Sequence, residues 1–360
     1  MKATQKLYDA GQSLWLDNIT RDLLTSGTLQ RYIDELSITG LTSNPTIFDH
    51  AIKNSTAYDA AIRERLKAGK SGESLFFEIA LEDITAAADL FRPIHRRTSG
   101  VDGWVSLEVS PTLAHDTKST VAQAKELALR AGRPNLFIKI PGTKEGLPAI
   151  EAAIFEGIPV NVTLLFSREQ YLAAADAYLR GVERRIAAGL NPNVGSVASL
   201  FVSRWDVAVA GKGPESLNNA LGIAIAELAY AAYSALMAHP RWQRAFNAGA
   251  RPQRLLFAST GTKDPKAADI LYVKALAAPL TVNTMPDNTL KAFADHGELG
   301  PMIGAARDCK VVLRAFGRAG IDLGALAARL QEEGAASFVA SWNELMGVIG
   351  SKSAKLGRAA

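Results

Sequence analysis

The chain has 360 residues, of which 48% are hydrophobic and 21% are charged, as in ordinary globular proteins. Its 40 basic and 36 acidic residues give a net charge of +4. The basic excess is spread along the chain, which does not indicate nucleic-acid binding. The single cysteine, Cys309, excludes an internal disulfide framework. No apolar run approaches ~18 residues and no signal-peptide pattern is present, so we expect a cytoplasmic protein that does not bind membranes.

Short apolar runs typical of strands alternate with amphipathic helical stretches along the chain. Eight strands alternating with helices predict an α/β fold, a single (β/α)₈ barrel formed by residues 1–350. A doubly wound sheet is the alternative, but no G-x-G-x-x-G turn occurs. The predicted strands cover residues 13–17, 38–43, 103–110, 135–141, 159–166, 193–201, 254–260 and 279–285, and the predicted helices include 73–96, 116–131, 143–155, 167–189, 214–238 and 266–277.

Two further helical stretches, residues 299–316 and 323–348, follow the last predicted strand. We expect them to pack on the outside of the barrel. The last ten residues, 351–360, are polar and basic, and we expect a flexible tail there.

Polar residues occupy the inward side of several predicted strands, late in each strand. Alternate residues of a barrel strand point inward, and barrel enzymes keep their sites at the carboxyl ends of the strands. The outward side is mostly aliphatic, as a surrounding helix layer requires. We therefore expect the inward polar residues to meet at one mouth of the barrel. They include Asp17, Glu108, Lys139, Asn161, Thr163 and Ser199.

Lys139 is the least expected of these residues, because it lies inside an apolar run. Desolvation disfavours the charged form of a buried lysine, by ~3–5 pKa units in fully buried cases. A neutral lysine is a nucleophile for carbonyl carbons. The resulting iminium draws electrons from an adjacent carbon–carbon bond. Asp17 and Glu108 are two carboxylates available for the proton transfers that such a cleavage requires.

A division of roles follows from this chemistry. Asp17 would be the acid/base at the substrate hydroxyl, and Glu108 with Thr163 would hold a water that carries protons. Asn44 and Asn161 would bind hydroxyls of the substrate. Structural roles stay open for the same residues: Lys139 and Glu108 could form only an ion pair, and Asp17 or Asn44 could only cap a helix.

Candidate phosphate ligands follow two later strands. Ser259 and Lys263 belong to the loop after the seventh predicted strand, where barrels often bind phosphate. Arg204 follows the sixth strand and offers a two-pronged guanidinium. The alternatives are a surface ion pair for Arg204 and a solvated loop lysine for Lys263.

Several motifs resemble those of the transaldolase family, in the family's order, over roughly residues 13–300. Residues 42–47, Thr-Ser-Asn-Pro-Thr-Ile, resemble its signature T-[ST]-N-P-[ST]-[IL]. Residues 137–141, Phe-Ile-Lys-Ile-Pro, resemble the strand that carries the Schiff-base lysine. Further matching segments are residues 108–109, 113–117, 161–167 and 199–204.

The resemblance implies a metal-free, cofactor-free transferase of the pentose phosphate pathway that moves a dihydroxyacetone unit between sugar phosphates. Sedoheptulose 7-phosphate and glyceraldehyde 3-phosphate would give erythrose 4-phosphate and fructose 6-phosphate. Lys139 would form the Schiff base, with the roles given above for Asp17, Glu108 and Thr163. The donor pocket would be lined by Asn44, Asn161, Ser199 and Phe201, and the phosphate would be held by Arg204, Ser259 and, as a substitute for the family's arginine, Lys263.

Other functions stay open at this point. They are a fructose 6-phosphate aldolase, a pyridoxal phosphate enzyme, a metal-dependent aldolase and a non-catalytic sugar-phosphate-binding barrel. The five histidines form no close-spaced ligand pair, which disfavours the metal enzyme. The sequence does not determine the oligomeric state, and a homodimer is one possibility that stays open.

Overall fold

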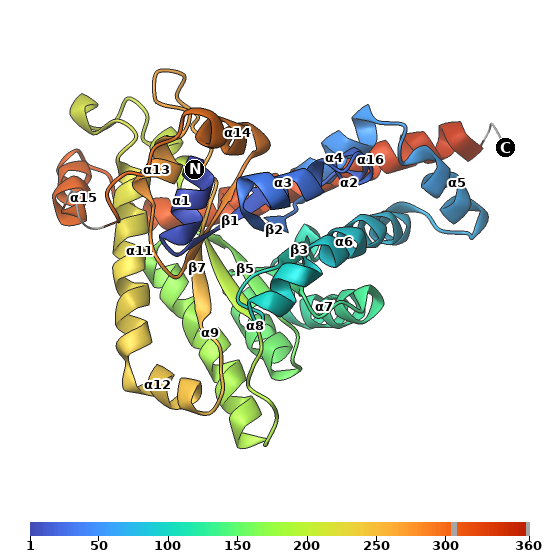
Figure 1. Cartoon of the computed structure of the whole chain (residues 1–360), viewed down its shortest axis with the longest axis horizontal. Coiled ribbons are helices and arrows are strands. Elements are labelled where there is room, and N and C mark those ends of the chain that lie inside the picture. Colours follow the sequence, from blue (N-terminus) through green and yellow to red (C-terminus); the bar gives the residue numbers. More distant parts are fainter. Residues whose placement is uncertain (304–307, 358–360) are drawn as a thin grey trace.

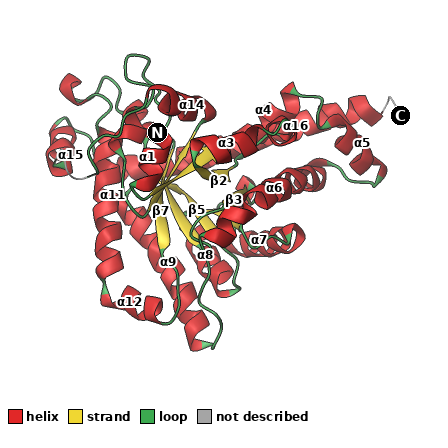
Figure 2. Cartoon of the chain, in the orientation of Figure 1, coloured by secondary structure: helices red, strands yellow, loops and turns green. Residues whose placement is uncertain are grey.

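The protein is described by a computed structural model that covers residues 1–303 and 308–357. Within these residues, eight parallel strands close into a barrel in the order β1 to β8, and helices surround it (Figures 1 and 2). The predicted (β/α)₈ fold is confirmed, and the doubly wound alternative is wrong because the sheet is closed. The strands are β1 (Gln12–Asp17), β2 (Ile38–Thr42), β3 (Trp104–Glu108), β4 (Leu136–Pro141), β5 (Val160–Leu165), β6 (Ser196–Phe201), β7 (Gln253–Ala258) and β8 (Thr281–Met285).

The helices follow the strands in chain order and form a layer around the barrel (Figure 2). The described helices and 3₁₀ turns are α1 (Ala3–Asp9), α2 (Arg21–Thr25), α3 (Thr28–Leu36), α4 (Pro45–Asn54), α5 (Asp59–Lys67), α6 (Gly72–Arg97), η1 (Pro111–Leu113), α7 (Thr117–Ala131), α8 (Gly146–Phe155), α9 (Arg168–Ala187), α10 (Ser203–Ala208), η2 (Glu215–Leu217), α11 (Leu221–Ala238), α12 (Pro240–Asn247), α13 (Leu271–Ala275), α14 (Asp287–His296), α15 (Cys309–Arg318) and α16 (Leu323–Gly357).

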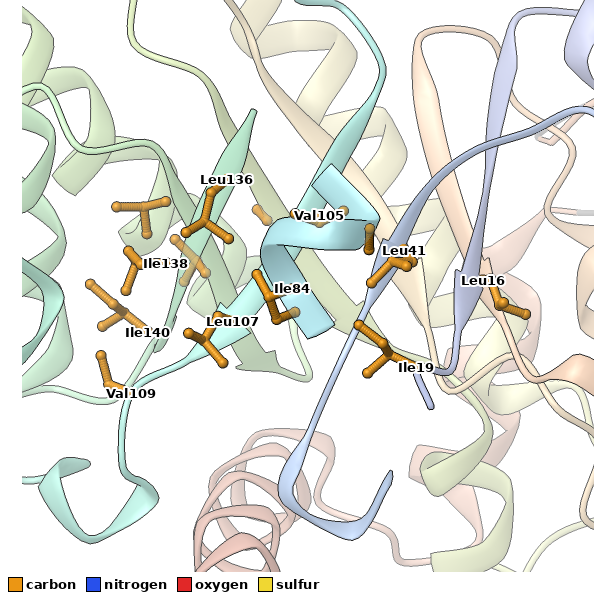
Figure 3. Close-up of a cluster of buried hydrophobic side chains, with 14 of the residues drawn as sticks. Leu16, Ile19, Leu41, Ile84, Val105, Leu107, Val109, Leu136, Ile138 and Ile140 are labelled. Atoms are coloured by element: carbon orange, nitrogen blue, oxygen red, sulfur yellow. The ribbon is translucent and has the colours of Figure 1, made fainter. Parts of the chain in front are cut away.

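The outward residues of the strands pack against the helices, as their alternation predicts. Figure 3 shows aliphatic side chains of β3 and β4 gathered with Ile84 of α6. Their spacing of two residues leaves the residues between them to face the barrel interior. The labelled outward residues of these two strands are Val105, Leu107, Leu136, Ile138 and Ile140.

The inward residues form an aromatic layer inside the barrel. The rings of Trp104 and Phe137 stack with centroids 4.1 Å apart, and Trp15 lies 6.0 Å from Phe137. A Cβ atom at Gly40 would lie only 2.7 Å from the Trp15 ring nitrogen, so this position requires a glycine. These rings occur earlier along their strands than Asp17, Glu108 and Lys139, which have the same parity. They therefore form a packed floor below the polar mouth.

Several predicted helices have different ends in the structure. The predicted helix 143–155 begins only at Gly146, because Thr143 Oγ1 accepts a hydrogen bond from the Gly146 N–H in a turn. The stretch 214–238 is divided into η2 and α11 by Asn219, which has a φ of 59°. Of the stretch 266–277, only α13 is helical. The stretch 299–316 contains the start of α15, and its residues 304–307 lie outside the described residues.

Helix α11 corrects the expectation that no apolar run approaches the length of a membrane span. Its 18 residues, Leu221–Ala238, are long and apolar enough to cross a membrane by length and composition. Core helices of soluble proteins meet the same criterion. One face of α11 is buried, with Ala226, Ala229 and Tyr233 in the main hydrophobic core. The apolar composition is thus used, at least in part, for packing within the fold.

Helix α16 corrects two expectations about the end of the chain. It passes over the carboxyl ends of β4 and β5 rather than packing on the barrel's outside: Gln331 Nε2 donates to the carbonyl oxygens of Gly142 (3.0 Å) and Leu164 (2.9 Å). The helix, red in Figure 1, then runs along α4 to the C-terminal end. It continues to Gly357, so the predicted tail 351–360 begins inside it, and residues 358–360 lie outside the described residues. The assignment of residues 1–350 to one domain stays a prediction.

Candidate active site

Lys139 of β4 is buried at the mouth of the barrel, with 5% of its surface exposed. Its Nζ donates to Glu108 Oε2 at 3.1 Å and to the carbonyl oxygen of Ser43 at 3.2 Å. Glu108 lies directly opposite Lys139 in the register of β3 and β4, so the parallel pairing itself brings the two groups together. This arrangement fits an ion pair and also a reactive amine with an adjacent proton acceptor.

Two carboxyl groups at the mouth have raised pKa values. Burial raises the pKa of Glu108, although the adjacent ammonium of Lys139 acts in the opposite direction. Burial also raises the pKa of Asp17, despite the opposing effects of Lys139 and of a 2.8 Å hydrogen bond from Thr42 Oγ1. Carboxyl groups whose pKa moves toward neutrality are suited to proton transfer. Asp17 does not cap the next helix, because Thr20 caps α2.

Thr163 has an unpaired hydroxyl within this mouth. It lies on β5, opposite Pro141 of β4, and is fully buried. Its Oγ1 has no hydrogen-bond partner in the structure. A buried polar atom without a partner is costly and is commonly satisfied by water. The Thr163 hydroxyl therefore fits the water site predicted for Glu108 and Thr163.

Asn161 is held in place by two serines. Ser199 Oγ donates to Asn161 Oδ1 at 2.7 Å, and Asn161 Nδ2 donates to Ser106 Oγ at 3.1 Å. All three side chains are buried, and Asn161 lies opposite Lys139 in the β4–β5 register. The serines fix the orientation of the amide, which leaves the second Nδ2 hydrogen for a ligand.

Asn44 has the structural role that the sequence left open. Its Oδ1 accepts a hydrogen bond from the Ile47 N–H at 3.0 Å, and Pro45 follows at the first position of α4. Asn44 is thus the N-cap of α4. The cap uses only the oxygen of the amide, so the Nδ2 group can still donate to a ligand.

Arg204 lies near two aromatic rings. Its Cζ is 5.1 Å from the ring centroid of Phe201 and 6.0 Å from that of Phe338. Burial lowers the pKa of the guanidinium. The described part of the chain places no carboxylate within ion-pair distance of it, so the surface ion pair considered for Arg204 is not formed there. A partly buried guanidinium without a counter-ion is suited to bind an anion.

The two candidates after β7 differ in their surroundings. Ser259 has a φ of 55°, and its Oγ lies 2.8 Å from Ser203 Oγ, next to Arg204. Lys263 is exposed, as a solvated loop lysine would be. Its charge is nevertheless close enough to oppose, in small part, the rise that burial causes in the pKa of Asp17. The structure therefore brings Ser259 near Arg204 and leaves Lys263 at the rim.

Sequence reasoning missed three features of the mouth. Thr42 Oγ1 bonds to Asp17 and lies 2.8 Å from Thr284 Oγ1 of β8, and Ser43 contributes a carbonyl oxygen to Lys139. Phe338 of α16 places its ring 5.3 Å from Lys139 Nζ. The inward parity of Thr42 could have been read from its strand. Phe338 could not, because its contact depends on the path of α16.

Potential metal ligands do not gather elsewhere in the described ranges. No group of three His, Cys, Asp or Glu side chains in residues 1–303 and 308–357 is placed to hold a metal ion. Two histidines lie on the surface beside carboxylates, His115 with Glu145 and His296 with Asp269.

The fold and the mouth define the class of protein: a (β/α)₈ barrel with a buried lysine and two carboxyl groups at the carboxyl ends of its strands. The chain belongs to the Transaldolase/Fructose-6-phosphate aldolase family, which it matches over residues 14–349.

Similar proteins named "Transaldolase" match almost the whole chain. That of Thermobifida fusca is 47% identical over 352 residues, which cover 95% of this chain and 96% of the relative. That of Arthrobacter sp. is 45% identical over 356 residues, with 96% of each chain covered. That of Mycobacterium tuberculosis is 46% identical over 351 residues, with 94% of each chain covered.

Proposed function

We propose that the protein is a transaldolase that moves a dihydroxyacetone unit between sugar phosphates through a Schiff base on Lys139. It interconverts sedoheptulose 7-phosphate plus glyceraldehyde 3-phosphate with erythrose 4-phosphate plus fructose 6-phosphate. The observation that carries this proposal is the buried contact between Lys139 Nζ and Glu108 Oε2, at the mouth of a barrel of this family.

Imine formation uses the pair of Lys139 and Glu108. The Lys139 nitrogen attacks the ketone carbon of the donor sugar and forms a carbinolamine. Glu108, whose pKa burial raises, accepts and returns protons during this step. A water bound at the unpaired Thr163 hydroxyl connects the carboxyl group to the departing oxygen.

Cleavage uses Asp17. Its carboxylate takes the proton from the hydroxyl next to the scissile bond, the hydroxyl oxygen becomes an aldehyde, and the bonding electrons pass into the iminium to give an enamine. The raised pKa of Asp17 suits a group that first accepts this proton and then returns it to the acceptor sugar. The enamine stays bound until an acceptor aldehyde arrives.

The remaining polar residues hold the two ends of the donor. Asn44 and Asn161 donate to its hydroxyls through their free Nδ2 hydrogens, with Ser199 and Phe201 beside them. Arg204 binds the phosphate as the unpaired guanidinium of the mouth, with Ser259 beside it and Lys263 at the rim. Small-molecule sugar phosphates are thus the proposed partners, and the single cysteine fits a cytoplasmic location.

The proposal is tested by supplying fructose 6-phosphate with and without erythrose 4-phosphate. Without the acceptor we expect no more than one glyceraldehyde 3-phosphate per active site, because the enamine stays bound. With the acceptor it should form continuously, and Lys139→Met should abolish its formation in both cases. Release of free dihydroxyacetone without an acceptor would indicate a fructose 6-phosphate aldolase instead. Binding of fructose 6-phosphate without any turnover would indicate a non-catalytic sugar-phosphate-binding barrel.

A further inference from the structure

One face of α16 is fitted to the mouth of the barrel. Gln331 bonds to the carbonyl oxygens at the ends of β4 and β5, and Gly334 and Phe338 follow on the same side of the helix. A Cβ atom at Gly334 would lie 3.0 Å from Leu164 Cδ2 and 3.4 Å from an Arg204 nitrogen. A side chain here would have to displace Leu164 or Arg204 slightly, so the glycine lets the helix pass close to the mouth without moving them. The approach brings the ring of Phe338 into the mouth.

Phe338 lies close to two cations of the mouth, Lys139 and Arg204. Its ring centroid lies 5.3 Å from Lys139 Nζ and 6.0 Å from Arg204 Cζ, which is within the range of cation–π attraction. The side chain is 6% exposed, so solvent screens neither contact strongly. The next buried residue of the helix, Trp342, packs against Phe76 and Phe77 of α6 and fixes this part of α16.

We propose that Phe338 is a positioning residue that favours the charged iminium on Lys139 and holds Arg204 at the phosphate end of the same donor sugar. The inference rests on the proposed function, because it assigns a partner to the intermediate of that reaction. It adds α16, a helix that follows the last strand of the barrel, to the elements that build the site.

The expected effect on the iminium follows from charge. The bound carbinolamine is neutral at its nitrogen; it takes up one proton at its hydroxyl, its carbon–oxygen bond breaks, water leaves, and the nitrogen lone pair forms the charged carbon–nitrogen double bond. The negative face of an aromatic ring attracts the product cation and not the neutral reactant. Phe338 therefore shifts this equilibrium toward the iminium, whatever the charge of Lys139 in the free enzyme.

The effect at the phosphate end follows from geometry. Arg204 lies near the rings of both Phe201 and Phe338, which come from β6 and α16. Two rings restrict the guanidinium plane more than one ring does, so less freedom is lost when it binds a phosphate. Weakening the Phe338 contact is therefore expected to raise the KM for phosphorylated donors more than for the unphosphorylated sugar.

The test replaces Phe338 by phenylalanine analogues with increasing ring fluorination, which weakens the negative face and nearly preserves the shape. With saturating fructose 6-phosphate, borohydride reduces the iminium but not the carbinolamine. We expect the iminium-to-carbinolamine ratio to fall stepwise with fluorination, by roughly 3- to 30-fold in total. The KM for fructose 6-phosphate should rise in the same order.

The matched control is the same fluorination of Phe316, which is buried on α15, 2% exposed. It should leave both the ratio and the KM unchanged. A ratio that is insensitive to fluorination at Phe338, or that changes equally at Phe316, would overturn the inference and leave the proposed function intact. If unmodified protein gives no adduct at Lys139 at all, the proposed function itself fails, so the two failures are distinguishable.

Discussion

Lys139 Nζ and Glu108 Oε2 lie 3.1 Å apart, and each side chain is 6% exposed. Removing two charges from water is expensive, and a buried ion pair recovers this cost only with good geometry and further hydrogen bonds. Here the Ser43 carbonyl supplies one such bond to the lysine. The pair is thus a costly arrangement for stability alone, which is consistent with a role in proton transfer.

Glu108→Gln separates the two roles of this carboxylate. The amide keeps an oxygen that can accept from Lys139 but cannot take up a proton near neutral pH. We expect turnover to fall by roughly 10²- to 10⁴-fold, the usual contribution of general acid–base catalysis. Binding of fructose 6-phosphate, measured by calorimetry, should change only a few-fold. A large loss of binding with little effect on the chemical step would favour a purely structural ion pair.

Arg204→Ala tests the phosphate site. We expect the KM for fructose 6-phosphate to rise by about 10- to 100-fold, since a charge-assisted contact of roughly 1.5–3 kcal/mol is lost. The KM for unphosphorylated fructose should change little. Arg184→Ala is the control, because Arg184 also stacks on an aromatic ring, Phe155 at 4.2 Å, but on the surface of α9. Equal effects of the two variants would remove Arg204 from the phosphate site.

We expect the stability of the protein to depend on pH through Asp206. Burial raises its pKa from 3.8 to about 6, and it accepts hydrogen bonds from the backbone of Leu221 (2.9 Å) and from Tyr272 (2.9 Å). The folded state therefore binds this proton more tightly than the unfolded state. The stabilisation is present at about pH 4 and is lost as the pH rises through about 6, a loss of about 3 kcal/mol.

Asp206→Asn removes this titration. Urea unfolding gives the free energy of unfolding of the variant and of the natural protein at each pH. The difference, variant minus natural protein, should increase by about 2–3 kcal/mol between pH 4 and pH 7.5. A flat difference for Asp206→Asn would contradict the prediction.

The end of α16 should contribute to stability. Lys352 Nζ donates to the Ser55 carbonyl oxygen at 2.6 Å and to Asp59 Oδ1 at 2.8 Å. We expect Lys352→Ala to lower the free energy of unfolding by about 1–2 kcal/mol. Lys355→Ala, at an exposed position of the same helix, should change it by less than about 0.5 kcal/mol. If both variants change the free energy of unfolding by the same small amount, the result would support the flexible tail that the sequence predicts for residues 351–360.

The barrel could be predicted from the sequence because its strands encode it locally. Alternation by two residues places Lys139 inward and Ile138 and Ile140 outward, and both follow from the residue order alone. Parallel strands end at the same mouth, so the meeting of Lys139 with Glu108 followed from the fold.

The path of α16 could not be predicted in this way. Its apolar spacing indicates that Phe338 is buried, but periodicity does not reveal which surface covers a helix face. The contact with Lys139 depends on Gly334 and on the Gln331 bonds to two strand ends, which are tertiary features. The role of Asn44 as a cap was likewise undecided by sequence, because Asn before Pro suits a cap and a ligand equally.

The most direct test of the account is the site of imine formation. The protein is treated with borohydride in the presence of fructose 6-phosphate, digested, and analysed by mass spectrometry. Irreversible inactivation with donor-derived mass on Lys139, absent when the sugar is omitted, is the predicted result. Label on any other lysine, or full activity after treatment, would contradict the account.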